Sequence, residues 1–196
     1  MKNVLFIATL LCLLGSEMVS AQSTRKEREQ AWREARAKRR AEAKALESIQ
    51  DSIAFIKAVK AIEEGNWVLE ADNMTFRNGL TRFVSNNTNY VAVHNGEGTV
   101  QTAFNNFVYS PNGLGGITVE GCTSAGKIGR DKEGNVYYNF SISGAGISAT
   151  LNLSLTGGTN EASIYICPNF NGNTLTMNGY LYPYEEATIF EGTTSW

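Results

Sequence analysis

Residues 136–181, VYYNFSISGAGISATLNLSLTGGTNEASIYICPNFNGNTLTMNGYL, decide the fold class of this chain. Four runs in this stretch alternate apolar and polar residues, and clusters of Gly, Asn, Ser and Thr separate them. Successive side chains of a strand point to opposite faces, so each run predicts a strand with one apolar face. The clusters tolerate the positive φ that tight hairpins require. We therefore predict a four-stranded antiparallel meander. Its expected apolar face comprises Val136, Tyr138, Phe140, Ile142, Ile147, Ala149, Leu151, Leu153, Leu155, Ala162, Ile164, Ile166, Leu175, Met177 and Leu181.

Five further strands are predicted upstream of the meander, joined by turns rich in Asn or Gly. They span residues 67–71, 80–85, 90–94, 99–104 and 117–124. Together with the meander they give about eight or nine strands, a number that favours an antiparallel β-barrel or a two-sheet sandwich. Residues 65–196 are long enough to form one self-sufficient β domain, so no second globular domain is needed.

A long α-helix is predicted before the β domain, within residues 22–64. This segment is rich in Ala, Glu, Arg and Lys, and Gly65-Asn66 is expected to end the helix. Up to Lys44 the only large apolar residue is Trp32, which predicts a solvated or partly disordered first half. The second half carries an apolar stripe that we expect to pack against the β domain. The stripe comprises Leu46, Ile49, Ile53 and Ile56, with Phe55, Val59 and Ile62 beside it.

The first 21 residues have the pattern of a secretory signal peptide. Lys2 precedes an apolar run over residues 4–14, and Val19-Ser20-Ala21 predicts cleavage after Ala21. The run is shorter than the roughly 20 residues that span a bilayer, so no transmembrane span is expected after cleavage. Cys12 is a poor lipidation site because Leu residues flank it. We expect an exported protein, periplasmic or associated with the outer membrane.

Cys122 and Cys167 are the only cysteines outside the predicted signal peptide. Disulfides persist in exported proteins, and both residues fall on the polar face of a predicted strand. A cross-strand disulfide needs Cα atoms within about 7 Å, so the sequence leaves open a disulfide or two free, half-buried thiols. No metal-ligand spacing accompanies them, and neither a metal site nor a cofactor is expected.

The sequence contains no constellation that specifies a reaction. His94 is the only histidine and stands beside a predicted turn, which disfavours a catalytic triad or a multi-histidine site. Residues 144–149, GAGISA, match a dinucleotide motif by letter but join two strands, without the helix that the motif needs. Two acidic pairs, Glu185-Glu186 and Glu70 with Asp72, have nothing that places them opposite a substrate. We expect a non-catalytic protein, with a hydrolase as the distant alternative.

Two features outside the apolar face bear on partners. The basic run of Arg36, Lys38, Arg39 and Arg40 lacks aromatic residues for base stacking, so nucleic acid is not expected. An anionic polymer or lipid of the envelope, or simply a solvated helix face, explains the run. The polar face of the meander carries several tyrosines. Either the apolar stripe of the helix packs over them, or they form a recognition patch for a partner. Packing under the helix is the more economical interpretation. These tyrosines are Tyr137, Tyr165, Tyr180 and Tyr182.

Residues 65–183 resemble an exported protein family of Bacteroides-like bacteria, domain of unknown function family 4251. The resembling stretches are WVLEAD (67–72), YVAV (90–93), VQTA (100–103), GLGGITVEG (113–121) and NGYLYP (178–183). The resemblance implies a signal sequence, a helical lead-in and a lipocalin-like antiparallel β fold. It implies no established activity and supplies no catalytic residues.

Two classes of function follow from these predictions. In the first, a β-barrel binds a small hydrophobic ligand in its interior, although in small barrels the same side chains often fill that space. The residues expected to line the interior are Tyr138, Phe140, Leu151, Leu153, Ile164 and Met177. In the second, the chain is a structural or protein-interaction module of the envelope that uses the basic helix or the tyrosine face.

Overall fold

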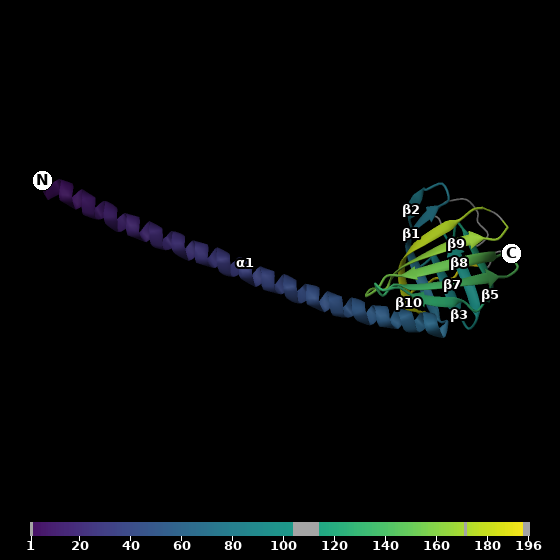
Figure 1. Cartoon of the computed structure of the whole chain (residues 1–196). Helices are drawn as coiled ribbons and strands as arrows, with labels where there is room; N and C mark the ends of the chain where they lie inside the picture. Colours follow the sequence, from purple (N-terminus) through teal and green to yellow (C-terminus); the bar gives the residue numbers. More distant parts are fainter. Residues whose placement is uncertain (1, 104–113, 171, 194–196) are drawn as a thin grey trace. The chain divides into compact units, whose positions relative to one another are not determined.

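The structure is a computed structural model that describes residues 2–103, 114–170 and 172–193, with side chains at Arg25 and from residue 27 onward. Helix α1 (Lys2–Glu64) precedes a β region (Figure 1). The chain divides into two compact units, Met1–Ile49 and Gln50–Trp196. The second unit contains the last turns of α1 together with the whole β region.

The β region is a closed antiparallel barrel. Its strands are β1 (Trp67–Phe76), β2 (Thr81–Phe83), β3 (Tyr90–His94), β4 (Glu97–Thr102), β5 (Ile117–Thr123), β6 (Lys127–Arg130), β7 (Val136–Ser143), β8 (Ser148–Leu155), β9 (Glu161–Pro168) and β10 (Leu175–Pro183). The sheet order is β10-β9-β8-β7-β5-β4-β3-β1, and pairing of β1 with β10 closes the ring of eight strands (Figure 1). Strand β2 pairs with β1, and β6 pairs with β7. Of the two architectures that the sequence allowed, the barrel is therefore the one that the structure shows.

The predicted meander is confirmed as strands β7 to β10, each paired with the next. Its predicted apolar face is the barrel interior, because Val136, Phe140, Leu151, Ile164 and Met177 all lie in one buried cluster. The five upstream strands also occur, at β1 to β5, with shifted ends. Strand β6 was not predicted, because its sequence, KIGR, has no apolar alternation and all four residues are exposed.

Helix α1 ends at Glu64, as the sequence predicts. Gly65 adopts a φ of 68°, the Gly65 amide donates to the Ile62 carbonyl, and the Asn66 amide donates to the Ala61 carbonyl. This pair of hydrogen bonds is the Schellman motif, for which glycine is favoured because it adopts positive φ without steric cost. The chain then turns directly into β1.

The last turns of α1 close one end of the barrel. Ala58, Val59, Ala61 and Ile62 are buried in the same cluster as the interior residues of the strands, with Phe55 at its edge. The prediction that the stripe packs on the β domain is wrong for Ile53 and Ile56, the two stripe residues in the same compact unit as the barrel, because both side chains are exposed. The residues beside the stripe make the contact instead, since Ala58 and Ala61 let the helix backbone approach the barrel closely.

The tyrosine face is consequently not covered by the helix stripe. Tyr137, Tyr165 and Tyr180 remain exposed on the barrel exterior. Tyr137 donates a hydrogen bond to Asp131 at 3.0 Å, and this bond raises the pKa of the phenol. The pKa of the Asp131 carboxyl is lowered, mainly by the hydrogen bond from the Asn135 side chain and to a smaller extent by the bond from Tyr137. Burial raises the pKa of Tyr182 on the same face.

The C-terminal segment after β10 covers the exterior of β1 and β3. It begins with the short 3-10 helix η1 (Tyr184–Glu186) and continues to residue 193. Tyr184, Ala187 and Ile189 contact a small buried cluster on the outer face of these strands, formed by Val68, Tyr90 and Ala92. Parts of β1 and β3 are therefore buried on both faces, whereas Tyr137, Tyr165 and Tyr180 of the meander are exposed on its outer side.

Candidate functional site

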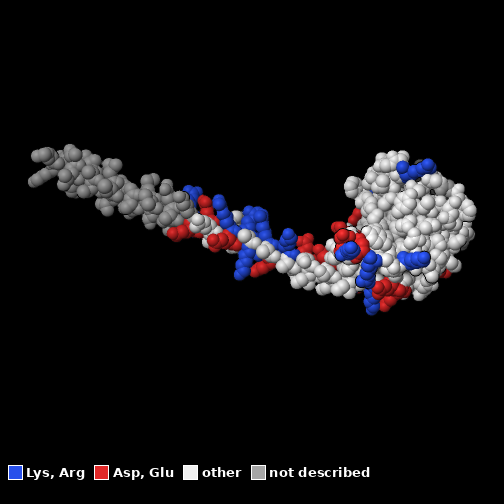
Figure 2. Space-filling view, viewed as in Figure 1, with Lys and Arg blue, Asp and Glu red and all other residues white. Residues whose placement is uncertain are grey.

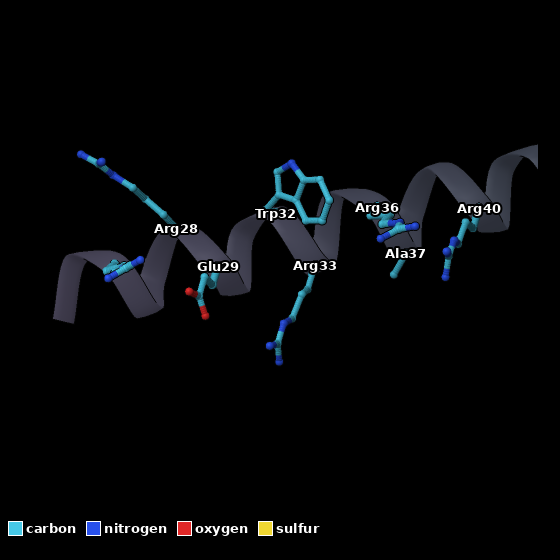
Figure 3. Close-up of a pocket in the computed structure, with 8 residues that line it drawn as sticks. Arg28, Glu29, Trp32, Arg33, Arg36, Ala37 and Arg40 are labelled. Atoms are coloured by element: carbon cyan, nitrogen blue, oxygen red, sulfur yellow. The ribbon is translucent and has the colours of Figure 1, made fainter. Parts of the chain in front are cut away.

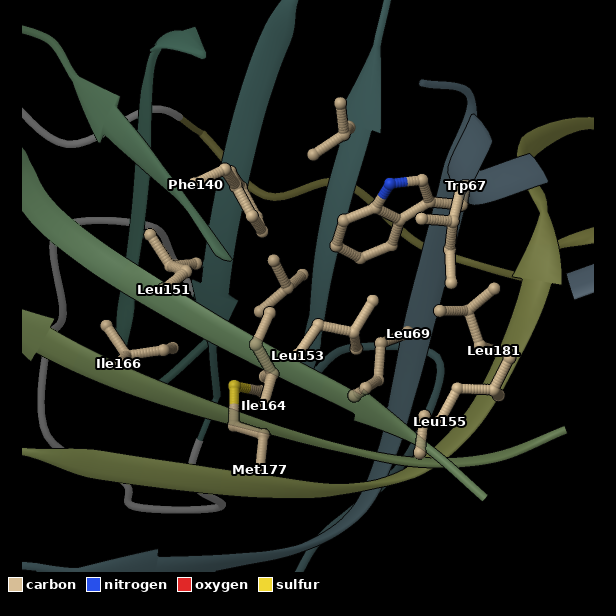
Figure 4. Packing of buried hydrophobic residues seen from close by; sticks show 14 of the residues in the cluster. Trp67, Leu69, Phe140, Leu151, Leu153, Leu155, Ile164, Ile166, Met177 and Leu181 are labelled. Carbon is tan, nitrogen blue, oxygen red and sulfur yellow. The ribbon is translucent and has the colours of Figure 1, made fainter. Parts of the chain in front are cut away.

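The interior residues predicted to line a ligand cavity pack against one another. Phe140, Leu151, Leu153, Ile164 and Met177 are buried in one cluster (Figure 4), and half-buried Tyr138 stacks on Phe140 with ring centroids 4.8 Å apart. Close packing of this kind leaves few voids as large as a water molecule. At the level of these side chains the barrel therefore has a filled core.

Trp67 lies between this core and the helix that closes the barrel. It is fully buried at the start of β1, and its ring meets Phe140 edge to face at a centroid distance of 5.8 Å (Figure 4). Ala58 and Ile62 of α1 belong to the same cluster. This end of the barrel offers no route to the interior between the described residues that close it.

A cavity of about 630 Å³ lies at the opposite end of the barrel, which we call the mouth. The end of β1, the end of β4, the start of β5 and the start of β10 meet there. The lining residues are Phe76, Arg77, Asn78, Thr102, Ile117, Asn173, Thr174 and Leu175. Leu175 also contacts the core cluster, so the filled interior forms the floor of the cavity. The volume falls within the range of typical small-molecule sites.

The walls of the mouth combine apolar side chains with one positive charge. Phe76, Ile117 and Leu175 supply the apolar surface, and Arg77 is the charged residue among the lining residues that the structure describes. The guanidinium of Arg77 lies over Gly172, where a Cβ atom would stand 2.7 Å from Nη1. A glycine at this position thus leaves room for the arginine to reach across the mouth.

The residues that line the mouth were not predicted, because no single sequence signal indicates them. Ile117 belongs to the predicted strand 117–124, but Arg77, Asn78, Asn173 and Thr174 lie outside every predicted strand. Exposed aromatic side chains also occur at this end, at Phe83 in β2 and at Phe170 between β9 and β10. The only available indication of a site at this end was an apolar residue on a turn, such as Phe170, and this indication is weak.

His94 lies at the end of β3 and stacks on Tyr184, with ring centroids 4.1 Å apart. Its Nε2 atom is 2.7 Å from Nδ2 of Asn95. Asn95 and Gly96 both have positive φ, 51° and 83°, and form the β3–β4 hairpin turn. These contacts account for His94 as a structural residue of the hairpin and of η1.

The acidic pairs also serve the fold. Glu70 is buried and accepts hydrogen bonds from the Thr188 amide at 2.6 Å and from Nδ2 of Asn86 at 3.3 Å. Asp72 is the extra residue of a β-bulge in β1, between Ala71 and Asn73. Glu186 forms an exposed ion pair with Lys57 at 2.7 Å. None of these carboxylates lines the mouth.

Gln101 is the polar residue that sequence reasoning missed. It is fully buried on the outer face of β4, where its Oε1 accepts from Thr118 at 2.8 Å and from the Gly192 amide at 2.7 Å. Its Nε2 donates to the carbonyls of Thr88 at 3.1 Å and Phe190 at 2.8 Å. Burial raises the pKa of neighbouring Tyr90 above its ordinary value, with Glu191 adding to the shift. This network fixes the C-terminal segment to the barrel.

Cys122 and Cys167 are both free thiols. Strands β7 and β8 separate β5, which carries Cys122, from β9, which carries Cys167. With neighbouring strands about 4.8 Å apart, three strand intervals exceed the Cα separation that a disulfide allows. Of the two alternatives that the sequence left open, the disulfide is therefore wrong for this fold.

The basic half of α1 shows a surface hollow of about 740 Å³ around Trp32, lined by Arg28, Glu29, Arg33, Arg36 and Arg40 among others (Figure 3). Arg36 lies over the Trp32 ring at 5.5 Å from the centroid, a cation–π distance. Every lining residue belongs to this one helix, so the hollow has no opposing wall and cannot enclose a ligand.

Within the described part of the chain, no three His, Cys, Asp or Glu side chains gather as they would around a metal ion. Among the same residues, no helix is long and apolar enough to cross a membrane.

The comparisons with known proteins identify a family. The model of "Domain of unknown function (DUF4251)" matches residues 50–181. A crystal structure of a DUF4251 family protein from Bacteroides eggerthii DSM 20697 is 48% identical in sequence, with a TM-score of 0.63, and the match covers 73% of this chain and 96% of that one. The search among curated proteins found no match. The matched residues include the closing turns of α1 and nearly all of the barrel, and the chain belongs to the DUF4251 family.

Proposed function

We propose that this protein is an exported, non-catalytic binding protein whose barrel mouth holds a small amphipathic ligand with an anionic head group. The observation that carries the proposal is the cavity at the mouth, with apolar walls at Phe76, Ile117 and Leu175 and a cation at Arg77. An apolar pocket with a few convergent polar groups is the usual form of a small-molecule site.

The composition of the mouth favours a negatively charged ligand end. Arg77 is accompanied by the neutral polar residues Asn78, Thr102 and Asn173, and among the described residues no carboxylate lines the cavity. A guanidinium binds carboxylate or phosphate oxygens through paired N–H donors. The apolar tail of such a ligand would rest on Leu175 and Phe76, above the filled core.

Binding without catalysis is the role that these residues support. His94 stacks on Tyr184 of η1, Glu186 forms an ion pair with Lys57, and neither these residues nor Glu185 are among those that line the mouth. Export is proposed from the signal-peptide pattern of residues 1–21. A periplasmic or outer-membrane-associated protein with such a site would carry or sequester an envelope lipid or a related amphiphile.

A dye titration tests the site directly. The anionic dye 1-anilinonaphthalene-8-sulfonate should bind the folded chain with saturable fluorescence. Ile117→Asp should weaken this binding at least about tenfold, because it places a carboxylate in the apolar wall. Ile128→Asp is the matched control, since Ile128 is 41% exposed on β6, Ile117 is 46% exposed, and only Ile117 lines the cavity.

A charge reversal tests the proposed head-group contact. Arg77→Glu should weaken binding of the anionic dye but leave binding of the uncharged dye N-phenyl-1-naphthylamine nearly unchanged. Arg82→Glu, on β2 and outside the cavity lining, should affect neither dye. Equal dye affinities for the Ile117→Asp and Ile128→Asp variants would remove the mouth as the binding site.

A second candidate function is an interaction module of the envelope. It is favoured by the exposed Ile53 and Ile56 of α1, which the barrel in the same compact unit does not cover.

A further inference from the structure

Helix α1 presents an apolar stripe to solvent. In the first compact unit, Leu46 and Ile49 are 58% and 57% exposed, and in the second unit Ile53 and Ile56 are 52% and 66% exposed. Large aliphatic side chains scattered singly on a surface are ordinary, but four in one helical register are not. We therefore expect another surface to bury this stripe.

The barrel of the same chain cannot be that partner for the second-unit residues. An α-helix turns by about 100° per residue, so Ile53 and Ile56 lie roughly opposite the side that carries Ala58 and Ile62. Ala58 and Ile62 are buried in the barrel core. The helix is thus apolar on two sides, one buried in the barrel and one exposed.

The spacing of the exposed residues is that of a helix–helix seam. Leu46, Ile49, Ile53 and Ile56 follow one another at intervals of three, four and three residues. Intervals of this kind are the a and d positions of a heptad, which interlock with the same positions of a second helix. We propose that the chain self-associates through this stripe, with the α1 helices of two copies running antiparallel.

The antiparallel direction follows from the residues that flank the stripe. With a two-fold axis beside Asp51, Leu46 of one copy lies opposite Ile56 of the other, and Ile49 lies opposite Ile53. In the same register the a and d positions further out pair opposite charges. Glu42 meets Lys60, and Arg39 meets Glu63.

A parallel pair would bring identical residues together at every position of the seam. Arg39, Glu42, Lys60 and Glu63 would each face the same charge in the second copy, which is destabilising. Both signs of charge alternate along the described helix in Figure 2. The surface pairs Lys60 with Glu64 at 3.6 Å and Arg130 with Glu63 at 2.9 Å are more than half exposed, so a second charge can join them.

The seam has only two apolar heptads, fewer than the three or four of a stable isolated coiled coil. The dimer should therefore be weak, with dissociation on the order of micromolar concentrations. Sedimentation velocity of the full chain over a wide concentration range measures this equilibrium. Ile49→Glu should raise the dissociation constant at least about tenfold, because it places a charge in the apolar centre. Since Ile49 is exposed, the barrel should melt unchanged.

Charge exchange tests the register. Glu42→Lys should weaken the dimer by opposing Lys60, and adding Lys60→Glu should restore it. Glu47→Lys is the matched control, because it makes the same change of charge outside the a and d positions and should leave the dimer intact. In a parallel dimer the double variant would gain nothing over the single one, and that result would overturn the proposal.

Cysteine crosslinking tests the direction in a background without the native cysteines, Cys12→Ser, Cys122→Ser and Cys167→Ser. Leu46→Cys and Ile56→Cys variants should each resist oxidation to a dimer alone and form a disulfide when mixed. Self-crosslinking of either variant would show a parallel pair and contradict the proposal. A chain that stays monomeric at all concentrations, or a dimer that Ile49→Glu does not weaken, would overturn it as well.

Discussion

Gln101 holds Gly192 by a hydrogen bond of 2.7 Å from the Gly192 amide to Oε1, across 91 positions of sequence. The same side chain binds the Phe190 carbonyl, the carbonyl of Thr88 in the turn before β3 and the hydroxyl of Thr118 in β5, so one amide group connects β4, β5 and the C-terminal segment. A buried polar network of this kind is stabilising only while each member is satisfied. Its disruption should therefore release the segment as a unit.

We predict that Gln101→Leu destabilises the fold by roughly 2–3 kcal/mol, because it removes the acceptor of the Gly192 amide and the donor to the Phe190 carbonyl. Amide hydrogen exchange at residues 188–193 should accelerate more than exchange in the meander. Asn152→Leu, which removes an exposed amide from β8, is the control and should change neither measurement. Unchanged exchange in Gln101→Leu would show that the segment is held by its apolar contacts.

Leu151→Asp should destabilise the barrel severely, by several kcal/mol, because it buries an unpaired carboxylate in the interior cluster. Thr150→Asp, one residue earlier on β8, should be tolerated because Thr150 lies on the outer face beside Asn169. Thermal melting of both variants measures the difference. Similar melting temperatures would contradict the assigned faces of β8.

Deletion of residues 22–44 should leave the barrel folded, because none of the buried core residues lies in that segment. Deletion through Ile62 should expose Trp67 and the rest of the barrel end that α1 closes, and should cause aggregation. Size-exclusion chromatography with thermal melting distinguishes the two. Unfolding after the shorter deletion would mean that the basic half of α1 is structural.

Burial and the neighbouring Glu120 raise the pKa of Glu191 above its ordinary value. Because the folded pKa exceeds the unfolded one, this group stabilises the fold at acidic pH, and that contribution is lost as pH rises through the folded value. Glu191→Gln should therefore raise the melting temperature at pH 7 and change it little at pH 4. Glu133→Gln, on the exposed β6–β7 turn, is the control and should leave the melting temperature unchanged at both pH values. A stabilisation by Glu191→Gln that is equal at both pH values would exclude this linkage.

The strand faces were predictable because successive side chains point to opposite faces whichever strands are neighbours. Phe140 and Leu153 share a face whether the domain is a sandwich or a barrel. The helix face was not predictable, because α1 has apolar residues on two sides. Large Ile53 and Ile56 suggested the packing side, yet the close approach to the barrel uses small Ala58 and Ala61.

The mouth and the C-terminal network depend on contacts between distant segments. Ile117 and Leu175 become neighbours of one cavity only when β1 pairs with β10 and the ring closes. Gln101 lies in the predicted strand 99–104, on the side expected to be polar. Neighbouring residues in the sequence did not indicate that residues near 190 would cover it. The alternation of side chains and the turn residues determine where the strands lie. The closure of the barrel and the position of the C-terminal segment over its outer face depend on the whole fold.

The central claim is that the mouth binds an amphipathic ligand, and native mass spectrometry of the protein purified from its own cells tests it most directly. We predict a lipid-sized adduct on the unaltered chain and on the Ile128→Asp variant, and its loss from the Ile117→Asp variant. An adduct retained equally by all three chains, or no adduct on any of them, would contradict the account.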